Sequence, residues 1–313
     1  MRFAILLVIS SLFFCSCSND SQKKKEIEDA PFISQQFTDD KGNTIRLSKK
    51  PTKVISLAPN ITEIVFAIGA GDKLIGRSQA CDYPDAALYK DEIITYPSLD
   101  LEQIKASGAE LLLTTDEIFT PDDISQLERL GIPVYQQSYK SVADIFRGIR
   151  KLGEVLDVEE RANVVADSLS ALEKKISEKT ENLVKYNTIL LITNNDPLMV
   201  AGGRGYLNEL IKKAGAKNAF AQTNKPYETI TPEAFLASKP EYLILPSSND
   251  QVYADFLTNF PSLYYTVAEK NNQVHIVDPD LIYRPGPRVV QGLMMLTQIF
   301  HSQLTPEEFV KDE

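Results

Sequence analysis

The chain of 313 residues contains no tryptophan, two histidines and three cysteines. So few histidines and cysteines exclude a zinc-finger array and a scaffold held together by disulfides. Basic residues are also in the minority, since 33 Lys and Arg stand against 43 Asp and Glu and give a formal charge of −10. This balance argues against nucleic-acid binding, which needs a basic surface. The length predicts about two domains, each large enough to bury a core of its own.

The first residues of the chain predict an export signal. An apolar run from Phe3 to Phe14 is too short to span a bilayer comfortably and indicates a signal peptide, residues 1–16. The residue after the expected cut, Cys17, resembles the lipidated cysteine of bacterial lipoproteins; a plain signal peptide is the alternative. Residues 17–35 then form a lipid-anchored linker. No second apolar run near 18 residues follows, so we expect a periplasmic or extracytoplasmic protein attached to a membrane by its lipid alone.

One structural unit occurs twice in the sequence. Residues 100–114 (DLEQIKASGAELLLT) and 231–245 (TPEAFLASKPEYLIL) match at an offset of 131 residues. Each copy begins with a residue favoured at a helix N-cap, continues as a short helix, breaks at Gly or Pro, and ends in an apolar strand. A weaker pair, residues 62–70 and 208–216, runs at an offset of 146 residues. The repeat predicts two lobes of similar architecture.

The expected fold class is α/β, with two Rossmann-like lobes around central sheets. We expect an N-terminal lobe over residues 36–141, an interlobe helical region over 142–185 and a C-terminal lobe over 186–313. Residues 159–183 lack Gly and Pro and carry apolar residues at helical spacing, so they predict one long helix that bridges the lobes. The expected strands are residues 53–57, 110–114, 133–135, 187–192, 242–245 and 274–277, with a hairpin at 37–47. A ligand cleft between the lobes follows, because ligands favour domain interfaces.

Three blocks of the sequence resemble a known family. Residues 54–76, Cys81-Asp82-Tyr83-Pro84 and Arg284-Pro285-Gly286-Pro287-Arg288 are similar to the periplasmic binding proteins of ABC importers for cobalamin and iron-siderophores, the type with a helical backbone. The resemblance implies two lobes on one rigid helix, little hinge closure and no enzymatic activity. It further implies a monomer that delivers a large metal-chelate ligand to an ABC permease dimer with its ATPase subunits. No cofactor and no protein-bound metal are expected.

The same resemblance implies the site residues. By position in the motifs, Glu102 and Glu233 dock onto the permease, one from each lobe, and these two residues also align in the internal repeat. The ligand-binding positions correspond to Tyr96, Thr115, Tyr227, Asp280 and Arg284, with Arg284 holding an anionic group that Asp280 helps to orient. Apart from the resemblance, Arg77 is a second candidate for an anion contact.

The nature of the ligand stays open between two classes. A corrinoid (cobalamin) is the first hypothesis, although the absence of tryptophan departs from the cobalamin binders of the family. A ferric siderophore or haem is the alternative. A secreted α/β hydrolase is a remote third possibility, since no G-x-S-x-G motif occurs and His275 and His301 have no partner nearby in the sequence. The glycine-rich run Gly202–Gly205 precedes a helix and is suited to an anion, but it lacks the ending of a phosphate-binding loop.

Overall fold

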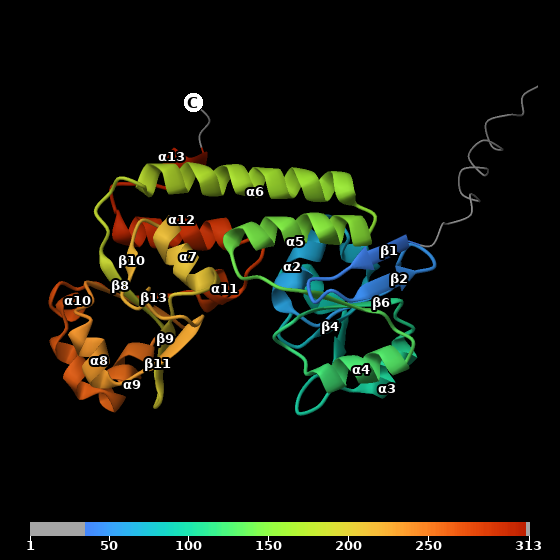
Figure 1. The fold of residues 1–313 in the computed structure, drawn as a ribbon, viewed down its shortest axis with the longest axis horizontal. Coiled ribbons are helices and arrows are strands. Elements are labelled where there is room, and N and C mark those ends of the chain that lie inside the picture. Colours follow the sequence, from blue (N-terminus) through green and yellow to red (C-terminus); the bar gives the residue numbers. More distant parts are fainter. Residues whose placement is uncertain (1–34, 311–313) are drawn as a thin grey trace, which may run out of the picture.

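Residues 35–310 are described by a computed structural model, which contains two α/β lobes joined by a long helix (Figure 1). This arrangement confirms the predicted fold class. The signal peptide predicted for residues 1–16, the lipid-bearing Cys17 and the linker up to residue 34 lie outside the described residues, as do residues 311–313.

The N-terminal lobe is built on a parallel sheet with the strand order β5-β4-β3-β6-β7. These strands are β3 (Val54–Ser56), β4 (Leu74–Ser78), β5 (Asp91–Ile93), β6 (Leu111–Thr115) and β7 (Val134–Gln137). An antiparallel hairpin of β1 (Gln35–Thr38) and β2 (Thr44–Leu47) precedes the sheet. The connections contain α2 (Pro59–Ala67), α3 (Leu101–Ser107), α4 (Pro121–Arg129) and the 3-10 turns η1 (Gly71–Lys73) and η2 (Asp85–Tyr89). Every residue of β3 is buried, as expected for a parallel strand covered on both faces.

The C-terminal lobe has a mixed sheet with the strand order β11-β9-β8-β12-β13, and β10 pairs with the start of β8. Its strands are β8 (Asn187–Thr193), β9 (Leu198–Ala201), β10 (Lys217–Asn218), β11 (Tyr227–Ile230), β12 (Tyr242–Pro246) and β13 (Val274–Val277). The helices are α7 (Tyr206–Lys213), α8 (Pro232–Ala237), α9 (Val252–Asn259), η3 (Pro261–Tyr265), α10 (Val267–Lys270), α11 (Pro279–Tyr283), α12 (Val289–Phe300) and α13 (Glu307–Val310).

The two sheets confirm the internal repeat. Numbered along the chain within each lobe, both five-stranded paths follow the order 3-2-1-4-5. The strongest repeat corresponds to α3 with β6 and α8 with β12, and in both copies the N-cap side chain (Asp100 or Thr231) accepts a hydrogen bond from the amide three residues on. The lobes differ at β9, which is antiparallel to β8 and to β11. In the C-terminal lobe this second strand precedes the helix α7, whereas in the N-terminal lobe β4 follows α2, and this difference explains why the two repeat pairs have different offsets.

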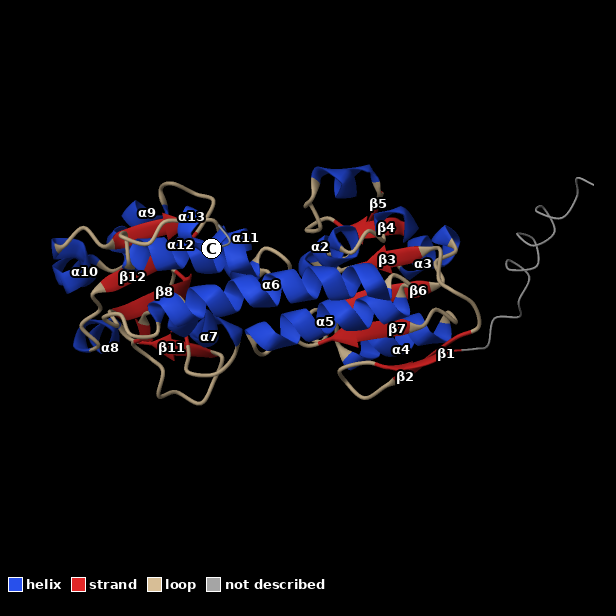
Figure 2. Ribbon diagram, turned by 90° about the horizontal axis from the view of Figure 1, so that it is seen from above, coloured by secondary structure: helices blue, strands red, loops and turns tan. Residues whose placement is uncertain are grey.

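Two helices connect the lobes. Helix α5 (Val142–Val155) runs into α6 (Glu159–Thr180) through a tight turn at Asp157, which has a φ of 57°. Figures 1 and 2 show α6 lying along one side of both lobes, over α5 at one end and α12 at the other. The helix is 22 residues long, or about 33 Å at 1.5 Å per residue. The sequence analysis predicted that this helix ends at residue 183, three residues beyond its end at Thr180.

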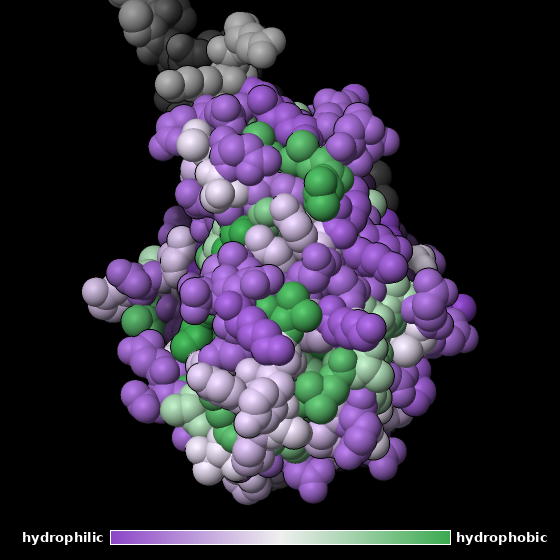
Figure 3. Space-filling view, turned by 90° about the vertical axis from the view of Figure 1, so that its left-hand side faces the viewer, coloured by the Kyte–Doolittle hydropathy of each residue, from purple (hydrophilic) through white to green (hydrophobic). Residues whose placement is uncertain are grey.

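One hydrophobic core runs through both lobes. It joins Leu113 of the first sheet to Ile244 of the second by way of Ile176 of α6 and residues of α5, α7 and α12. Two smaller clusters cover the outer faces of the sheets, one in each lobe. The outer end of the C-terminal lobe shows mostly hydrophilic surface with separate small apolar groups (Figure 3). Shared packing of this kind resists large rotations of one lobe against the other.

Candidate functional site

Two of the motifs singled out in the sequence meet between the lobes. Arg288, just before α12, donates from Nε to Glu63 Oε2 at 2.9 Å and from Nη2 to Glu63 Oε1 at 2.6 Å. Glu63 belongs to α2 of the other lobe and its side chain is 2% exposed. The Arg288 guanidinium also lies 4.1 Å from the centre of the Tyr83 ring, a cation–π contact. A buried bidentate ion pair of this kind fixes both the distance and the relative orientation of the two segments that carry its residues.

Arg284 belongs to the same network. Its Nη1 donates to Asp82 at 2.7 Å and lies 3.5 Å from Glu63, and its Nε lies 2.9 Å from Asp280. The hydrogen bond from Arg284 lowers the pKa of Asp82. The predicted pairing of Asp280 with Arg284 is therefore present. The predicted anion contact through Arg284 is not supported, because three carboxylates already share its guanidinium.

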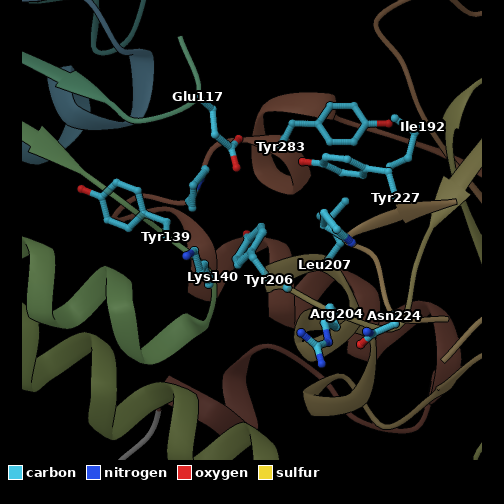
Figure 4. Close-up of a pocket in the computed structure, with 13 residues that line it drawn as sticks. Glu117, Tyr139, Lys140, Ile192, Arg204, Tyr206, Leu207, Asn224, Tyr227 and Tyr283 are labelled. Carbon is cyan, nitrogen blue, oxygen red and sulfur yellow. The ribbon is translucent and has the colours of Figure 1, made fainter. Parts of the chain in front are cut away.

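A cavity of about 840 Å³ opens between the lobes beside this network (Figure 4). The N-terminal lobe contributes loops that follow β6 and β7, while the C-terminal lobe contributes the ends of β8 and α11, the start of α7 and the loop into β11. The lining residues are Glu117, Tyr139, Lys140, Ile192, Arg204, Gly205, Tyr206, Leu207, Asn224, Pro226, Tyr227, Tyr283 and Pro285. A second hollow of about 330 Å³ adjoins the cavity and shares four of these residues with it. The predicted interlobe cleft is thus present, at the carboxyl ends of strands β6, β7 and β8.

Four tyrosine side chains line the cavity and make its walls largely aromatic. Tyr227 opens the edge strand β11, and Tyr283 ends α11 with its hydroxyl donating to the Leu191 carbonyl at 2.8 Å. Figure 4 shows the rings of Tyr227 and Tyr283 close together at one end of the cavity. Burial raises the pKa of Tyr227, with a further contribution from the nearby Glu117 carboxylate. Tyr139 is hydrogen-bonded to Gln137, whereas the buried Tyr206 hydroxyl has no hydrogen-bond partner among the described residues.

The cavity is polarised. In Figure 4 the Glu117 carboxylate points inward at the end occupied by Tyr227 and Tyr283, while Lys140 and Arg204 lie around Tyr206 at the other end. No ion pair of Lys140 or Arg204 is found within the described part of the chain. Such an arrangement suits a large, mostly apolar ligand with polar groups of different kinds at its two ends.

The predicted ligand residues fall into three groups. Tyr227 lines the main cavity, and Thr115 and Arg284 line the adjoining hollow. Tyr96 lines neither and is 88% exposed, in the segment that leads to α3. Asp280 lies behind Arg284 in the ion-pair network.

Arg77 requires a correction. This side chain is buried and donates to three main-chain carbonyls, among them that of Ala87 from Nε at 3.0 Å and that of Ser78 from Nη1 at 3.0 Å. Its guanidinium therefore holds the loop after β4 in place and lines neither hollow. The sequence could not distinguish the two roles, because it does not show whether an arginine near the end of a strand, such as Arg77 in β4, turns toward main-chain carbonyls or toward a ligand.

Glu102 and Glu233 occupy equivalent places in the two lobes. Each is exposed in the first turn of its helix, α3 or α8. A hydrogen bond from the Thr231 side chain lowers the pKa of Glu233. Figure 1 places α3 and α8 at the side of the molecule away from α6. The two carboxylates are thus available to one partner that spans both lobes.

Two lobes with equivalent sheets, a rigid helical connection and a cavity between them define a two-lobed binding protein. The family described as periplasmic binding protein matches residues 54–281, and the chain belongs to this family. It is similar to the vitamin B12-binding protein of Vibrio parahaemolyticus serotype O3:K6, with 28% identity over 268 residues, 83% of this chain and 94% of the relative. It is also similar to the ABC transporter substrate-binding lipoprotein YvrC of Bacillus subtilis, with 27% identity over 303 residues, 93% of this chain and 94% of the relative. Among solved structures, a periplasmic heme-binding protein from Pseudomonas aeruginosa matches with a TM-score of 0.72 and 26% identity over 82% of this chain and 96% of its own.

These findings define the class of the protein. It is an extracytoplasmic substrate-binding protein of an ABC importer, and such proteins are carriers and not enzymes. Across residues 35–310, no helix has the length and apolar character needed to cross a membrane. The same part of the chain contains no group of three or more His, Cys, Asp or Glu side chains placed to hold a metal ion.

Proposed function

We propose that the protein captures a corrinoid in the interlobe cavity and delivers it to the permease. The observation that carries the proposal is the cavity itself, whose volume of about 840 Å³ lies in the upper part of the range for small-molecule sites and whose walls carry four tyrosine rings. Aromatic faces with a polar edge suit a wide macrocycle that carries amide substituents. The vitamin B12-binding relatives support the same ligand class.

A ferric siderophore or haem is the second candidate. Lys140 and Arg204 favour it, because both cations line one end of the cavity and suit a chelate with acidic groups. The heme-binding neighbour among the solved structures is consistent with this alternative. In both cases the ligand brings its own metal.

Titration of intrinsic tyrosine fluorescence separates the two candidates. The purified chain is titrated with cyanocobalamin, with haem and with ferric siderophores of the hydroxamate and catecholate classes. We expect quenching by cyanocobalamin at micromolar concentration, and Tyr227→Ala reduces the affinity at least tenfold. Tyr89→Ala is the matched control, since Tyr89 is 89% exposed and lines neither hollow. Quenching by haem or a siderophore alone would replace the corrinoid with the second candidate.

The loaded protein docks through Glu102 and Glu233 onto a permease dimer that works with its ATPase subunits. Their exposure, one in each lobe, supports this role because exposed carboxylates form bidentate pairs with arginine. A monomer presents both carboxylates to the two halves of such a dimer. Tyr96, six residues before Glu102 as Tyr227 is before Glu233, stands free to contact a bound ligand from the N-terminal lobe.

Membrane attachment through a lipid on Cys17 completes the proposal. It rests on the sequence Cys15-Ser16-Cys17 after an apolar run and on the lipoprotein named among the relatives. Metabolic labelling with a radioactive fatty acid tests it. We expect label in the wild-type chain and none in Cys17→Ala, with Cys15→Ala as the control that keeps its label.

A further inference from the structure

The C-terminal lobe contains a separate cavity of about 510 Å³, which we call the outer hollow. Its wall includes Tyr186, Tyr242, Gln273, His275, Gln298 and Phe300. It lies between the amino ends of β8, β12 and β13 and the last turns of α12, whereas the interlobe cavity lies at the carboxyl ends of strands. Figure 1 shows α12 running away from the N-terminal lobe, so the outer hollow is remote from the interlobe cavity. Its volume lies within the range of small-molecule sites.

A nearly buried hydroxyl in the outer hollow lacks a partner in the protein. Tyr242 lines the hollow and is only 9% exposed, and its hydroxyl forms no hydrogen bond within residues 35–310. The unpaired hydroxyls that are closed off from solvent in this part of the chain are those of Tyr206 and Thr297, so the Tyr242 hydroxyl remains accessible. Buried polar groups are normally hydrogen-bonded. The partner of this hydroxyl must therefore come from whatever fills the outer hollow.

Aromatic rings form one wall of the outer hollow. The His275 ring is nearly parallel to the Tyr242 ring, at an angle of 13° with 6.0 Å between the ring centres, and the Tyr186 ring lies 5.0 Å from Tyr242 on a tilt. Phe300 of α12 meets the Tyr242 ring edge-on at 5.4 Å and holds it in place. Tyr186 and His275 are both partly exposed. Their rings are therefore available to stack against a planar ligand.

The outer hollow is polar but carries no charge of its own. The polar side chains around the rings are Gln273, Gln298, Ser302 and Gln303. Within residues 35–310, no Asp, Glu, Lys or Arg lines the hollow. His275 Nε2 lies 2.9 Å from Gln273 Oε1, and burial lowers the pKa of His275, which favours the neutral ring. Burial also raises the pKa of Tyr242, with smaller contributions from Tyr186 and from the Glu241 carboxylate, whose charge disfavours an anion beside it. A charged ligand would find no opposite charge in this wall.

We propose that the outer hollow is a second ligand site, which takes a neutral planar nitrogen heterocycle that stacks on the rings of Tyr186 and His275 and hydrogen-bonds to the Tyr242 hydroxyl. Such a ring offers both donors and acceptors at its edge, which match the hydroxyl and the amides of the glutamines at the rim. The site goes beyond the proposed function and does not depend on it, because the outer hollow and the interlobe cavity are lined by different residues.

Two matched pairs of heterocycles test the site. Nicotinamide is compared with nicotinate, and hypoxanthine with urate; at pH 7 the first member of each pair is neutral and the second is an anion. The ¹⁵N-labelled full chain is titrated with each probe, and the amide shifts of residues 273–275 and 298–303 are followed. We expect these shifts to saturate at millimolar concentration or below for at least one neutral probe, and its anionic counterpart to bind at least tenfold more weakly. Saturation by neither neutral probe, equal binding of the anion, or shifts confined to residues 204–207 and 226–227 of the interlobe cavity overturns the proposal.

Three variants test the roles of the hydroxyl and of the neutral rim. Tyr242→Phe removes the hydroxyl and keeps the ring, and we expect the affinity for the neutral probe to fall three- to tenfold. Gln298→Lys adds a cation at the exposed rim, where folding is not disturbed, and should shift the preference at least threefold toward the anionic probe. Tyr265→Phe is the matched control in the same lobe, since Tyr265 is 72% exposed and lies outside the outer hollow, and it should change neither value. An affinity unchanged in Tyr242→Phe, or a preference unchanged in Gln298→Lys, contradicts the proposal.

Discussion

Glu63 and Arg288 form a bidentate ion pair between the two lobes, with donor–acceptor distances of 2.6 and 2.9 Å. The residues stand 225 positions apart in the sequence and bring α2 against the segment before α12. In the internal repeat, Glu63 corresponds to Glu209, which accepts a hydrogen bond from the Val142 amide at the start of α5. Equivalent glutamates of the two lobes therefore each tie their own lobe to an element outside it.

We expect the Glu63–Arg288 ion pair to fix the distance between the two lobes. Arg288→Met leaves the buried Glu63 carboxylate with its weaker partner Arg284, and breaking a buried pair costs about 3–5 kcal/mol. Arg288→Lys costs less, because an ammonium still neutralises Glu63 but cannot donate in bidentate fashion. Urea unfolding measures both free energies. Spin labels at Lys105→Cys and Ala237→Cys report the distance between α3 and α8, which we expect to broaden in Arg288→Met.

A surface pair supplies the control for this prediction. Glu178 lies 3.7 Å from Lys174 on the exposed face of α6, and pairs of this kind contribute less than about 1 kcal/mol. Glu178→Gln should change neither the unfolding free energy nor the spin–spin distance. If Arg288→Met behaves in the same way, the pair does not hold the lobes.

Charge reversal tests the docking surface. Glu102→Lys together with Glu233→Lys places cations where the permease is proposed to present arginines, so like charges repel. We expect unchanged ligand affinity by fluorescence titration and loss of ligand uptake in cells. Glu160→Lys, on α6 and far from the proposed surface, is the control for a general effect of added positive charge. Uptake that persists in the double variant shows that docking uses other residues.

The lobes and their order could be predicted from the sequence, because the repeat is carried by local signals. Helix caps, glycine or proline breaks and apolar strands recur at fixed spacing, and they correspond to α3–β6 and α8–β12. Strand β5 was missed because Asp91–Ile93 is short and mostly exposed. Strand β9 was missed because four residues after a proline give no periodic pattern.

The cavity was only partly predictable, for a different reason. Tyr227 was identified through the family resemblance, but Tyr206 and Tyr283 become neighbours of it only when three separate elements meet. Arg284 and Arg77 carry the right chemistry for an anion, yet their partners decide their roles. Those partners are Asp82 and Glu63, some 200 residues away, in one case and main-chain carbonyls in the other. Only the glycine-rich run before Tyr206 marked this end of the cavity in the sequence.

The pH dependence of stability follows from Asp40 in the β1–β2 turn. Burial opposes its ionisation, but the Ser138 amide, Lys151 and Arg147 outweigh it and hold the pKa of Asp40 below its ordinary value of 3.8. A lowered folded-state pKa stabilises the protein above the unfolded value, and this contribution is lost as the pH falls through the folded value. Asp40→Asn should therefore cost about 1–3 kcal/mol at pH 7 and progressively less as the pH falls below 3.8.

Urea unfolding at several pH values measures this difference. Asp157→Asn is the matched control, since Asp157 forms an exposed ion pair with Lys50 at 2.7 Å and its φ of 57° suits asparagine. The control should stay within about 0.5 kcal/mol of the wild type at every pH. A destabilisation by Asp40→Asn that is constant from pH 7 to well below pH 3.8 would show that packing, and not charge, explains its role.

The close approach of α5 and α6 predicts the effect of one methyl group. A Cβ on Gly153 would lie 2.3 Å from the Cβ of Ala162 and 3.2 Å from the Cα of Glu159. Helix propensity favours Gly153→Ala by about 1 kcal/mol, whereas overpacking at such a contact costs about 1–3 kcal/mol and requires the helices to move apart. The clash outweighs propensity here because the contact atoms belong to backbone and a Cβ, which cannot rotate away. Thermal unfolding should show a lower Tm for Gly153→Ala. The Tm should recover in Gly153→Ala/Ala162→Gly, where the space for the methyl group is restored. A raised Tm in the single variant would mean that α5 and α6 separate at little cost and that α6 is not a rigid connection between the lobes.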